Sequence, residues 1–330
     1  MKILFSSHCF APSVGGIEEV SGILAEEFGK MGHDVTVVTR TPGNGLFPFS
    51  VKRRPGPAAL ARLARWSDVV FHNNLSLRTA WPLLAIRRPW VVAHHTCLAR
   101  ADGRVAAVDR LKQRVVRGAS NVAVSTAIAA RLDARARVIP NPYRDELFRR
   151  TDSPRTADII FVGRLVSDKG VDVLLDALGT LKRRGSPRRL TIVGDGPERA
   201  PLEAQAERLG VDARFAGVRR GEELAALLNE HRVLVAPSRW EEPFGLVALE
   251  GMACGCVPVV ARSGGLPEAV GDAGVVFDKG DARALADCIE KLDEGRIEAL
   301  RRAAAPHLEK HRAESIARQY LEVLEEAAAG

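Results

Sequence analysis

The sequence predicts an α/β protein built from two doubly wound parallel sheets. Short β-branched runs alternate with helical patterns along the whole chain, and the runs are almost entirely apolar. Strands that are buried on both faces of a parallel sheet have this composition, whereas half-exposed strands alternate apolar with polar residues. The regular alternation of strand and helix favours right-handed crossovers. The length of 330 residues agrees, because roughly 150 residues per domain gives about two domains.

Twelve runs are expected to form strands, six in each half. The first half contains KILFSS (2–7), DVTVVT (34–39), DVVFHN (68–73), WVVAHH (90–95), NVAVS (121–125) and RVIPN (137–141). The second half contains DIIFVGR (158–164), RLTIVGD (189–195), ARFAG (213–217), RVLVAPS (232–238), VPVVAR (257–262) and AGVVF (273–277). A polar stretch that carries a proline, near 145–157, separates the halves. We therefore expect two Rossmann-like domains, residues 1–150 and 151–330.

The composition excludes several protein classes. The chain is 46% hydrophobic and 27% charged, which is ordinary for a globular protein and excludes disorder. No apolar run approaches the roughly 20 residues that a bilayer span needs. The apolar stretch at the N-terminus is too short for a secretory signal. The five cysteines form no CxxC pair, which argues against a disulfide framework or structural zinc and favours a reducing cytosol.

The net charge of +7 is unevenly distributed. Residues 1–150 hold 23 Lys and Arg against 11 Asp and Glu, a net +12, which leaves the second half at −5. A basic half predicts an anionic partner: a membrane face, a phosphorylated acceptor or nucleic acid. A bias toward arginine with no partner is the alternative. Nucleic acid is disfavoured, because the chain has no recognition motif and few aromatic residues to stack bases.

Ligand-binding residues are expected just after the strands, because doubly wound sheets bind ligands at the carboxyl ends of their strands. Gly15 and Gly16 follow the first strand and open a helix, so their backbone could approach an anion; a plain turn is the alternative. His94 and His95 close the run at 90–95. Alternation turns the two rings to opposite faces, so only one is expected to reach the site. A structural histidine is the alternative.

In the second half, Arg164 and Lys169 follow a strand and lie five residues apart. Two cations at a strand end suit a diphosphate; two solvated surface cations are the alternative. Gly194-Asp195-Gly196-Pro197 resembles the start of GxGxxG, but Arg199 occupies the sixth position. We interpret it as a turn, and the missing fingerprint disfavours NAD. Asp-x-Asp does not occur in the chain, which weakens any mechanism that needs a carboxylate-held divalent ion.

The segment from Glu242 to Glu250 follows the strand at 232–238. Pro243 suits the first turn of a helix, and Gly255 suits its end. Glu242 at the helix entrance would accept hydrogen bonds from hydroxyl groups. Glu250 lies about two turns further on, and a carboxylate on so apolar a helix is expected to have a specific partner; a buried glutamate that is satisfied within the protein is the alternative. The helix N–H groups expected to face the same ligand belong to Phe244, Gly245 and Leu246.

With these residues the chain resembles the retaining, GT-B-fold glycosyltransferases of family 4, close to the group 1 domain pattern. Glu242 and Glu250 match the E-x7-E signature of that family. The resemblance covers nearly the whole chain and is strongest over about 158–278. Its stretches are FVGRLVSDKGVDVLLDA, LTIVGDGP, FAGVRRGEELAALL, VLVAPSRWEEPFGLVALEGMACGCVPVVA and SGGLPEAV, with looser matches at Gly15, Gly16, His95, Ser125 and 139–141.

The resemblance implies a GT-B architecture, in which an acceptor-side domain (1–150) faces a nucleotide-sugar domain (151–330) across a cleft. The last helix, about 309–328, would pack back on the first domain. The implied catalytic residues are His95, Glu242, Arg164 and Lys169. The implied donor-binding residues are Gly15, Gly16, Arg164, Lys169, Glu242, Phe244, Gly245, Leu246 and Glu250, with Gly217 and Val218 near the base.

The implied activity is transfer of a hexose or N-acetylhexosamine from a UDP- or GDP-linked sugar to a glycan, without a metal or a cofactor. The acceptor would be lipid-linked or membrane-proximal, in polysaccharide or glycolipid synthesis. We expect a cytoplasmic protein, peripheral at the inner face of the membrane through its basic half. The candidate contacts are Lys52, Arg53, Arg54 and an amphipathic helix within 104–117; a packed helix with a solvated basic face is the alternative. The alternative function is a non-catalytic nucleotide-sugar-binding subunit of a transferase complex.

Overall fold

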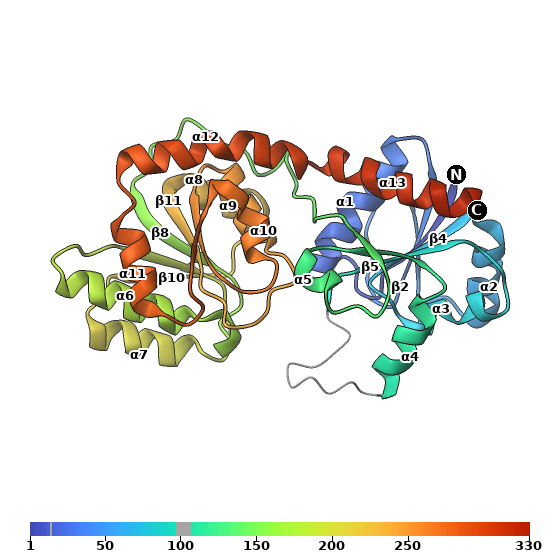
Figure 1. Cartoon of the computed structure of the whole chain (residues 1–330), viewed down its shortest axis with the longest axis horizontal. Helices are drawn as coiled ribbons and strands as arrows, with labels where there is room; N and C mark the ends of the chain where they lie inside the picture. Colours follow the sequence, from blue (N-terminus) through green and yellow to red (C-terminus); the bar gives the residue numbers. More distant parts are fainter. Residues whose placement is uncertain (14, 97–106) are drawn as a thin grey trace. The chain divides into compact units, whose positions relative to one another are not determined.

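The structure is a computed structural model that describes residues 1–13, 15–96 and 107–330 (Figure 1). By its contacts the chain divides into two compact units. Unit 1 comprises Met1–Pro142 together with His311–Gly330, and unit 2 comprises Tyr143–Lys310. Each unit is a parallel sheet with its own helices, and each is described by itself.

The sheet of unit 1 has seven strands in the described residues, all parallel, in the order β3-β2-β1-β4-β5-β6-β7. They are β1 (Lys2–Ser6), β2 (Asp34–Thr39), β3 (Ser50–Arg53), β4 (Val69–Asn73), β5 (Trp90–His94), β6 (Ser120–Ala123) and β7 (Ala136–Val138). The helices are α1 (Gly16–Lys30), α2 (Pro57–Trp66), α3 (Leu77–Ala80), η1 (Trp81–Leu84), α4 (Ala107–Val116), α5 (Thr126–Ala129) and α13 (Ala313–Ala329).

The sheet of unit 2 has six parallel strands in the order β10-β9-β8-β11-β12-β13. They are β8 (Ala157–Val162), β9 (Leu190–Val193), β10 (Ala213–Gly217), β11 (His231–Ala236), β12 (Val257–Ala261) and β13 (Val275–Phe277). The helices are η2 (Ser167–Lys169), α6 (Val171–Arg183), α7 (Arg199–Leu209), α8 (Gly221–Glu230), α9 (Leu246–Ala253), α10 (Leu266–Val270), η3 (Gly271–Ala273), α11 (Ala282–Glu290) and α12 (Glu294–Lys310).

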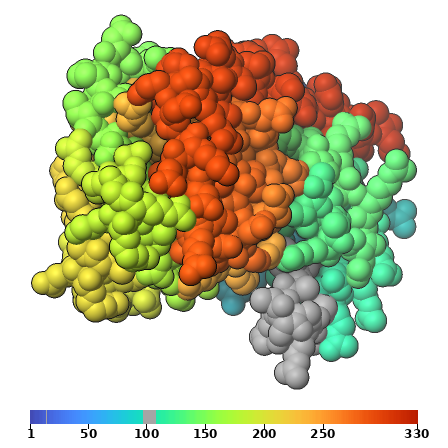
Figure 2. Space-filling view, turned by 60° about the vertical axis from the view of Figure 1, so that its left-hand side comes forward, coloured from blue at the N-terminus to red at the C-terminus, as the bar shows by residue number. Residues whose placement is uncertain are grey.

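Aromatic and aliphatic side chains from both sheet faces hold the helices in place. In unit 1, α1 and α13 lie side by side (Figure 1), and Tyr320 of α13 meets the ring of Phe71 in β4 at 5.5 Å. Phe71 also meets Phe5 of β1 edge-on at 4.8 Å. In unit 2, Leu174, Leu178 and their neighbours on α6 are buried against the sheet. Figure 2 shows the surface of unit 2 where α6 and α11 adjoin.

The α/β prediction is confirmed, and all twelve expected strands form. One strand was not expected: β3 (Ser50–Arg53), at the edge of the first sheet. Its side chains alternate between exposed and half-buried, so it lacks the apolar run that marks a central strand. Lys52 and Arg53, taken as part of a basic patch, belong to this edge strand, and Arg53 donates to the carbonyl of Thr41.

Both strand orders reverse direction at one point. In unit 1 the chain starts at β1, adds β2 and β3 on one side, and then returns to add β4 on the other. In unit 2 the same reversal lies between β8 and β11. Ligands of open α/β sheets bind outside the carboxyl ends of the strands at such switch points. These two positions are therefore where the site residues should be sought.

Candidate functional site

Two of the expected cations follow β8, on one side of the switch point of unit 2. Arg164 is exposed, and among the described residues it has no ion-pair partner. Lys169 closes the short η2 helix and is half-buried. Gly170 follows with a φ of 68°, and a Cβ placed there would lie 2.1 Å from the carbonyl oxygen of Pro237. The backbone therefore brings the end of η2 directly against the segment that follows β11.

Glu242 comes from that segment, on the other side of the switch point. Its Oε1 atom accepts hydrogen bonds from Lys169 Nζ and from Ser238 Oγ, each at 2.6 Å. Ser238 is buried, and the side chain of Glu242 is 14% exposed. The structure thus joins two residues that the sequence assigned to different parts of a ligand. Ser238 was missed, although it ends the run at 232–238.

Backbone hydrogen bonds fix the position of this ion pair. The carbonyl of Asp168 accepts from the N–H groups of Arg239 and Trp240 at 2.8 and 3.1 Å. The Arg239 side chain reaches Asp172 at the start of α6, with 2.6 Å between the charged atoms. These contacts connect η2 and the start of α6 to the 238–242 segment, and they hold Lys169 and Glu242 close to each other.

The glycine pair at 264–265 supports Glu242 from the other side. Gly265 N–H donates to the carbonyl of Glu242 at 2.7 Å. A Cβ on Gly264 would lie 2.0 Å from the same carbonyl oxygen, so only glycine allows this approach. Glu241 accepts from Gly264 N–H at 2.9 Å and pairs with Lys279. The stretch SGGLPEAV, which carried part of the family resemblance, therefore holds the backbone of the acidic segment.

The helix after Glu242 begins later than expected. α9 begins at Leu246, with Gly245 before it at a φ of 128°, so Pro243 lies in the preceding loop and not in the first turn. The side chain of Phe244 is buried and serves to anchor that loop. The N–H groups of the first turn, from Leu246 onward, have no carbonyl four residues back within the helix. The expectation of Gly255 at the helix end is confirmed, with a φ of 84° one residue past the Cys254 cap.

The remaining expected residues of unit 2 lie on the same sheet edge or on α9. Glu250 is half-buried in the second turn of α9. Gly217 ends β10, and its carbonyl accepts from Gly194 N–H at 2.9 Å. Val218 follows and is 48% exposed. The 194–197 segment is irregular and leads through a turn into α7 at Arg199, so the interpretation as a turn is confirmed, and Pro197 precedes the helix.

In unit 1, Gly15 and Gly16 lie where β1 leads into α1, at the switch point of that sheet. The side chain of Glu18, in the first turn of α1, lies beside them: its Oε1 accepts from Ser13 Oγ at 3.1 Å. A Cβ on Gly15 would meet the Glu18 carboxylate at 2.6 Å. This carboxylate, which sequence reasoning did not assign, gives the glycine turn a negative neighbour.

His95 follows β5 directly and is 3% exposed. Its Nε2 atom lies 2.6 Å from Asn73 Oδ1, at the end of β4. Burial, together with the neighbouring His94, lowers the pKa of His95 to about 3, so its ring is neutral near pH 7. His94 bonds elsewhere, with Nε2 at 2.8 Å from Asn121 Oδ1. The two adjacent rings therefore have different partners, as alternation predicts.

The basic helix expected within 104–117 is only partly described, because Arg104 and Val105 lie outside the described residues. From Val108 onward the apolar stripe is divided. Val108 and Leu111 are 51% and 50% exposed, whereas Val116 is buried against the sheet. No helix in the described part of the chain is long and apolar enough to cross a bilayer.

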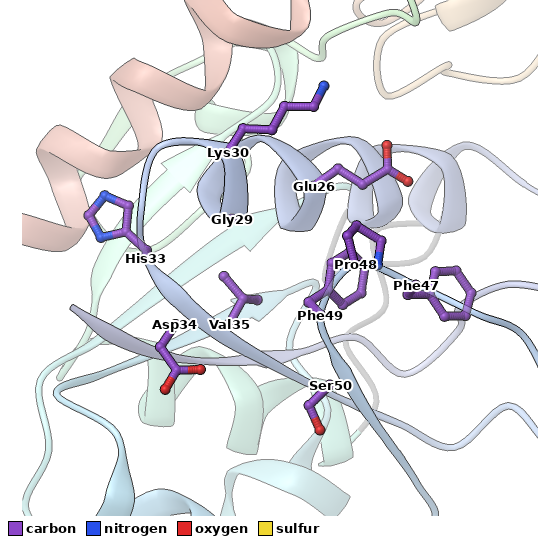
Figure 3. A pocket seen from close by; sticks show the side chains of 10 residues that line it. All are labelled: Glu26, Gly29, Lys30, His33, Asp34, Val35, Phe47, Pro48, Phe49 and Ser50. Atoms are coloured by element: carbon purple, nitrogen blue, oxygen red, sulfur yellow. The ribbon is translucent and has the colours of Figure 1, made fainter.

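An open pocket lies elsewhere in unit 1, between the end of α1 and the beginnings of β2 and β3 (Figure 3). Its volume is about 680 Å³. Glu26 and Lys30 of α1 and the rings of Phe47 and Phe49 line it (Figure 3). Because it lies at the amino ends of these strands, it is remote from the switch point, and none of the expected site residues lines it.

Comparison with known sequences finds a family match that covers most of unit 2. Residues 144–306 match the family of glycosyl transferases group 1. A D-inositol 3-phosphate glycosyltransferase of Corynebacterium jeikeium is 34% identical over 262 residues, which is 67% of this chain and 62% of the relative. A glycogen synthase of Mycobacterium tuberculosis is 40% identical over 158 residues, 46% of this chain and 38% of the relative. The chain therefore spans less than two thirds of the length of these relatives.

Solved structures match over the whole chain. HepE of Anabaena in complex with UDP has a TM-score of 0.84 at 22% identity, with 99% of this chain and 100% of that one covered. Sucrose-phosphate synthase of Thermosynechococcus elongatus has a TM-score of 0.83 at 22% identity, with 99% of each chain covered. This likeness shows the GT-B type of fold. Residues 144–306, which make up most of unit 2, therefore form a glycosyl transferases group 1 domain.

Proposed function

We propose that the chain is a retaining, metal-independent glycosyltransferase that moves a hexose or N-acetylhexosamine from a UDP- or GDP-linked sugar to a glycan. The ion pair of Lys169 with Glu242, at 2.6 Å and at the switch point of the group 1 domain, carries the proposal. An ammonium group suits the diphosphate, and a carboxylate beside it suits sugar hydroxyls. The structures of HepE with UDP and with UDP-glucose support this choice of donor class.

The hydrogen-bonding capacity of the pair is not exhausted. Lys169 carries three N–H donors, and Glu242 takes one of them, which leaves two for phosphate oxygens. Glu242 accepts from Lys169 and from Ser238 at Oε1, so Oε2 is left for sugar hydroxyls. Arg164 supplies a second cation, and the first turn of α9 supplies N–H groups. Glu250 would hold the ribose, and Gly217 and Val218 would lie beside the base.

In the proposed reaction the bond between the anomeric carbon and the diphosphate breaks through an oxocarbenium-like state. Negative charge grows on the leaving phosphate, where Arg164, Lys169 and the α9 N-terminus stabilise it. Gly15 and Gly16 would approach the same diphosphate, and His95 would contact the sugar. The acceptor hydroxyl attacks from the face that the diphosphate leaves and passes its proton to the departing phosphate oxygen, so the configuration is retained. Isolation of a glycosyl adduct on a carboxylate of the enzyme would contradict same-face attack.

The basic surface of unit 1 suggests a lipid-linked or membrane-proximal acceptor and a peripheral place at the inner face of the membrane. Exposed Val108 and Leu111 on α4 stand beside Arg110 and Arg114, a combination that favours an anionic interface. Vesicle sedimentation at low salt tests this proposal. We expect more protein with anionic vesicles than with neutral ones, and equal recovery would refute it.

Thermal shifts with UDP, GDP, ADP and dTDP, without magnesium, test the donor class. A nucleotide at 100 times its dissociation constant stabilises by about 2.7 kcal/mol. We expect one nucleotide to raise the melting temperature of the wild type and much less that of Glu250→Ala. Asp287→Asn is the matched control, because Asp287 on α11 pairs with Arg184 at the end of α6, outside the site. Failure of every nucleotide to shift the wild type would refute the proposed donor.

Glu242→Gln separates the sugar from the diphosphate. The amide keeps the shape but removes the charge that neutralises Lys169. We expect UDP or GDP alone to bind as well as to the wild type or better, and the matching nucleotide sugar to bind at least about tenfold more weakly. Equal weakening of both ligands would contradict the assignment of Glu242 to the sugar.

The alternative is a non-catalytic subunit that binds nucleotide sugar within a transferase complex. The site residues of unit 1 distinguish the transferase from the subunit, because a subunit that only binds nucleotide sugar needs no side chain beside the anomeric carbon. Release of the nucleotide diphosphate from its sugar, measured with a mixed glycan or lipid extract as acceptor, separates them. Binding without release in every extract, and with unchanged binding in His95→Ala, would favour the subunit.

A further inference from the structure

A chain of buried polar side chains runs behind His95 at the switch point of unit 1. Asn73 Nδ2 lies 2.7 Å from Ser21 Oγ and 3.3 Å from the carbonyl oxygen of Ile17. Ser21 Oγ lies 2.8 Å from Ser7 Oγ, and Ser7 Oγ lies 2.7 Å from the carbonyl oxygen of Cys9. These side chains come from β4, from α1 and from the residue after β1. All three are buried, so each hydrogen must find an acceptor within the chain of bonds.

The direction of these bonds follows from the two backbone carbonyls, which can only accept. Ser7 donates to Cys9, and Ser21 donates its one hydrogen either to Ser7 or to the Ile17 carbonyl, which lies 2.7 Å away. In both cases the oxygen of Ser21 is left as an acceptor for Asn73. The group of Asn73 that faces Ser21 and Ile17 must then be its NH₂, with one hydrogen for each. The carbonyl oxygen of Asn73 therefore faces His95, and every donor in the chain is used.

The reversed orientation of the Asn73 amide satisfies fewer of these hydrogen bonds. It would place the Asn73 oxygen 3.3 Å from the Ile17 carbonyl, with two acceptors in contact. It would also require Ser21 to donate its one hydrogen to Asn73, which breaks the bond of Ser21 to the Ile17 carbonyl. Only the hydrogen of Ser7 would then remain for the contacts of Ser7 with Cys9 and with Ser21. A buried bond that is lost in this way costs more than an ordinary hydrogen bond contributes.

We propose that Asn73 is a positioning residue that holds His95 as the Nε2–H tautomer and leaves its Nδ1 lone pair as an acceptor for a hydroxyl of the donor sugar. The inference rests on the proposed function for the identity of the ligand, but the tautomer stands on geometry alone. Nε2 must donate, because Asn73 offers only an oxygen. Nδ1 has no hydrogen-bond partner among the described residues, and burial keeps the ring neutral. His95 then accepts a hydrogen bond from a sugar hydroxyl, and the charge of the diphosphate is neutralised by the cations of unit 2.

His94 supplies an internal control of the same construction. Its Nε2 faces Asn121 Oδ1, and the Asn121 amide donates to the carbonyls of Val116 and Ala119, both at 2.9 Å. Two adjacent histidines thus face two asparagines whose amides are fixed by backbone carbonyls. The Nδ1 atom of His94, however, is buried and has no partner, so this ring offers nothing to a ligand. Asn121 can therefore be altered to match a change at Asn73.

Nitrogen-15 NMR of the imidazole rings in the unliganded wild type tests the tautomer without any activity. The signal of His95 is assigned by its loss in His95→Gln. We expect a protonated Nε2 and an unprotonated Nδ1 at pH 7, unchanged at pH 5. A protonated Nδ1, a mixture of tautomers or an imidazolium at pH 7 would overturn the inference. Since the measurement needs no donor, it decides the tautomer even if the proposed function fails.

Asn73→Asp tests the positioning role. A carboxylate still accepts from Nε2 but raises the pKa of His95, so the ring becomes charged and Nδ1 ceases to accept as pH falls. We expect the His95 signal to titrate above pH 5, with kcat falling at least about tenfold over the same range while the wild type stays flat. Asn121→Asp should leave His95 and the pH profile of kcat unchanged.

Ser21→Ala is the second variant, in case the carboxylate at 73 prevents folding. It removes one acceptor of the Asn73 amide together with the contacts of Ser21 to Ser7 and to the Ile17 carbonyl. The contact of Asn73 with Ile17 and that of Ser7 with Cys9 remain. We expect a mixture of His95 tautomers and a loss in kcat of several-fold, with little change in nucleotide binding. An unaltered His95 signal together with unaltered kcat in both Ser21→Ala and Asn73→Asp would refute the positioning role.

Discussion

His72 in β4 is buried completely, and neither of its ring nitrogens has a hydrogen-bond partner in the described residues. Its ring meets Trp90 edge-on at 5.8 Å. Desolvation alone lowers the pKa of His72 from 6.5 to about 4, because an imidazolium would have no water and no counter-ion here. We predict that His72 contributes to the acid sensitivity of unit 1, beside the buried His94 and His95, whose pKa values are also lowered. His72→Leu should remove the share that His72 contributes.

The sign follows from proton binding. Below pH 6.5 the unfolded chain protonates His72, whereas the folded chain does so only near pH 4. The unfolded state therefore binds more protons over this window, and the free energy of unfolding falls as pH falls. Each pH unit between the two values is worth about 1.4 kcal/mol, so the full loss approaches about 3 kcal/mol. Between pH 7 and pH 5, the free energy of unfolding falls by about 2 kcal/mol through His72.

Urea unfolding at pH 7, 6 and 5, followed by tryptophan fluorescence, measures this loss. Three of the four tryptophans, Trp66, Trp81 and Trp90, belong to unit 1. The packing cost of His72→Leu does not depend on pH, so it cancels when the two pH values are compared. We expect the wild type to lose about 2 kcal/mol more than the variant between pH 7 and pH 5.

Tyr320→Phe is the control for this experiment. It also removes a buried polar atom without a partner from unit 1, but burial raises the pKa of Tyr320, so it does not titrate in the acid range. Its pH dependence should equal that of the wild type. If His72→Leu loses as much stability on acidification as the wild type, the His72 ring is hydrated or charged in the folded state and the reasoning fails.

Three further outcomes are expected. Gly170→Ala should lower unit 2 stability by about 2 kcal/mol or more and weaken nucleotide binding in a thermal-shift assay, since its Cβ would overlap the Pro237 carbonyl at a φ of 68°. Arg155→Met should destabilise unit 2 in urea by about 1–3 kcal/mol, because it strips the guanidinium bond at 2.5 Å from the buried Cys254 carbonyl. Glu18→Gln should tighten nucleotide diphosphate binding several-fold in calorimetry if Gly15 and Gly16 approach the diphosphate, because it removes a like charge; unchanged affinity would count against that role of the glycines.

Periodicity predicted the fold well because most of the described strands are buried on both faces, although β3, β7 and β10 are not. The run at 257–262 is a clear case: all five residues of β12, Val257–Ala261, are buried. β3 escaped prediction because an edge strand exposes alternate side chains. The start of α9 was placed too early for a related reason. Pro243 is compatible with a first turn, but the φ of Gly245, which delays the helix, is a backbone property that no residue type encodes by itself.

The candidate site was predicted as a set of residues and not as a set of contacts. Strand ends pointed to Arg164, Lys169 and His95, since the position alone suggests a ligand. Asn73 also ends a strand, but its amide has meaning only through Ser21 on α1, 52 positions earlier in the chain. Such pairings depend on the crossover geometry, so a pattern in one segment cannot reveal them.

The pairing of Lys169 with Glu242 changes how the two residues should be understood. If the two residues did not pair, each would carry an unbalanced charge at the sheet edge. At 2.6 Å each lowers the cost of partly burying the other, while each keeps bonding capacity for the donor. Substitution of either residue therefore changes the binding of both the diphosphate and the sugar. It weakens the contact that the substituted residue makes and strengthens the contact that its partner makes. The effects of Lys169→Met and Glu242→Gln should then be less than additive in a double-mutant cycle, and strict additivity would show that the pair separates when the donor binds.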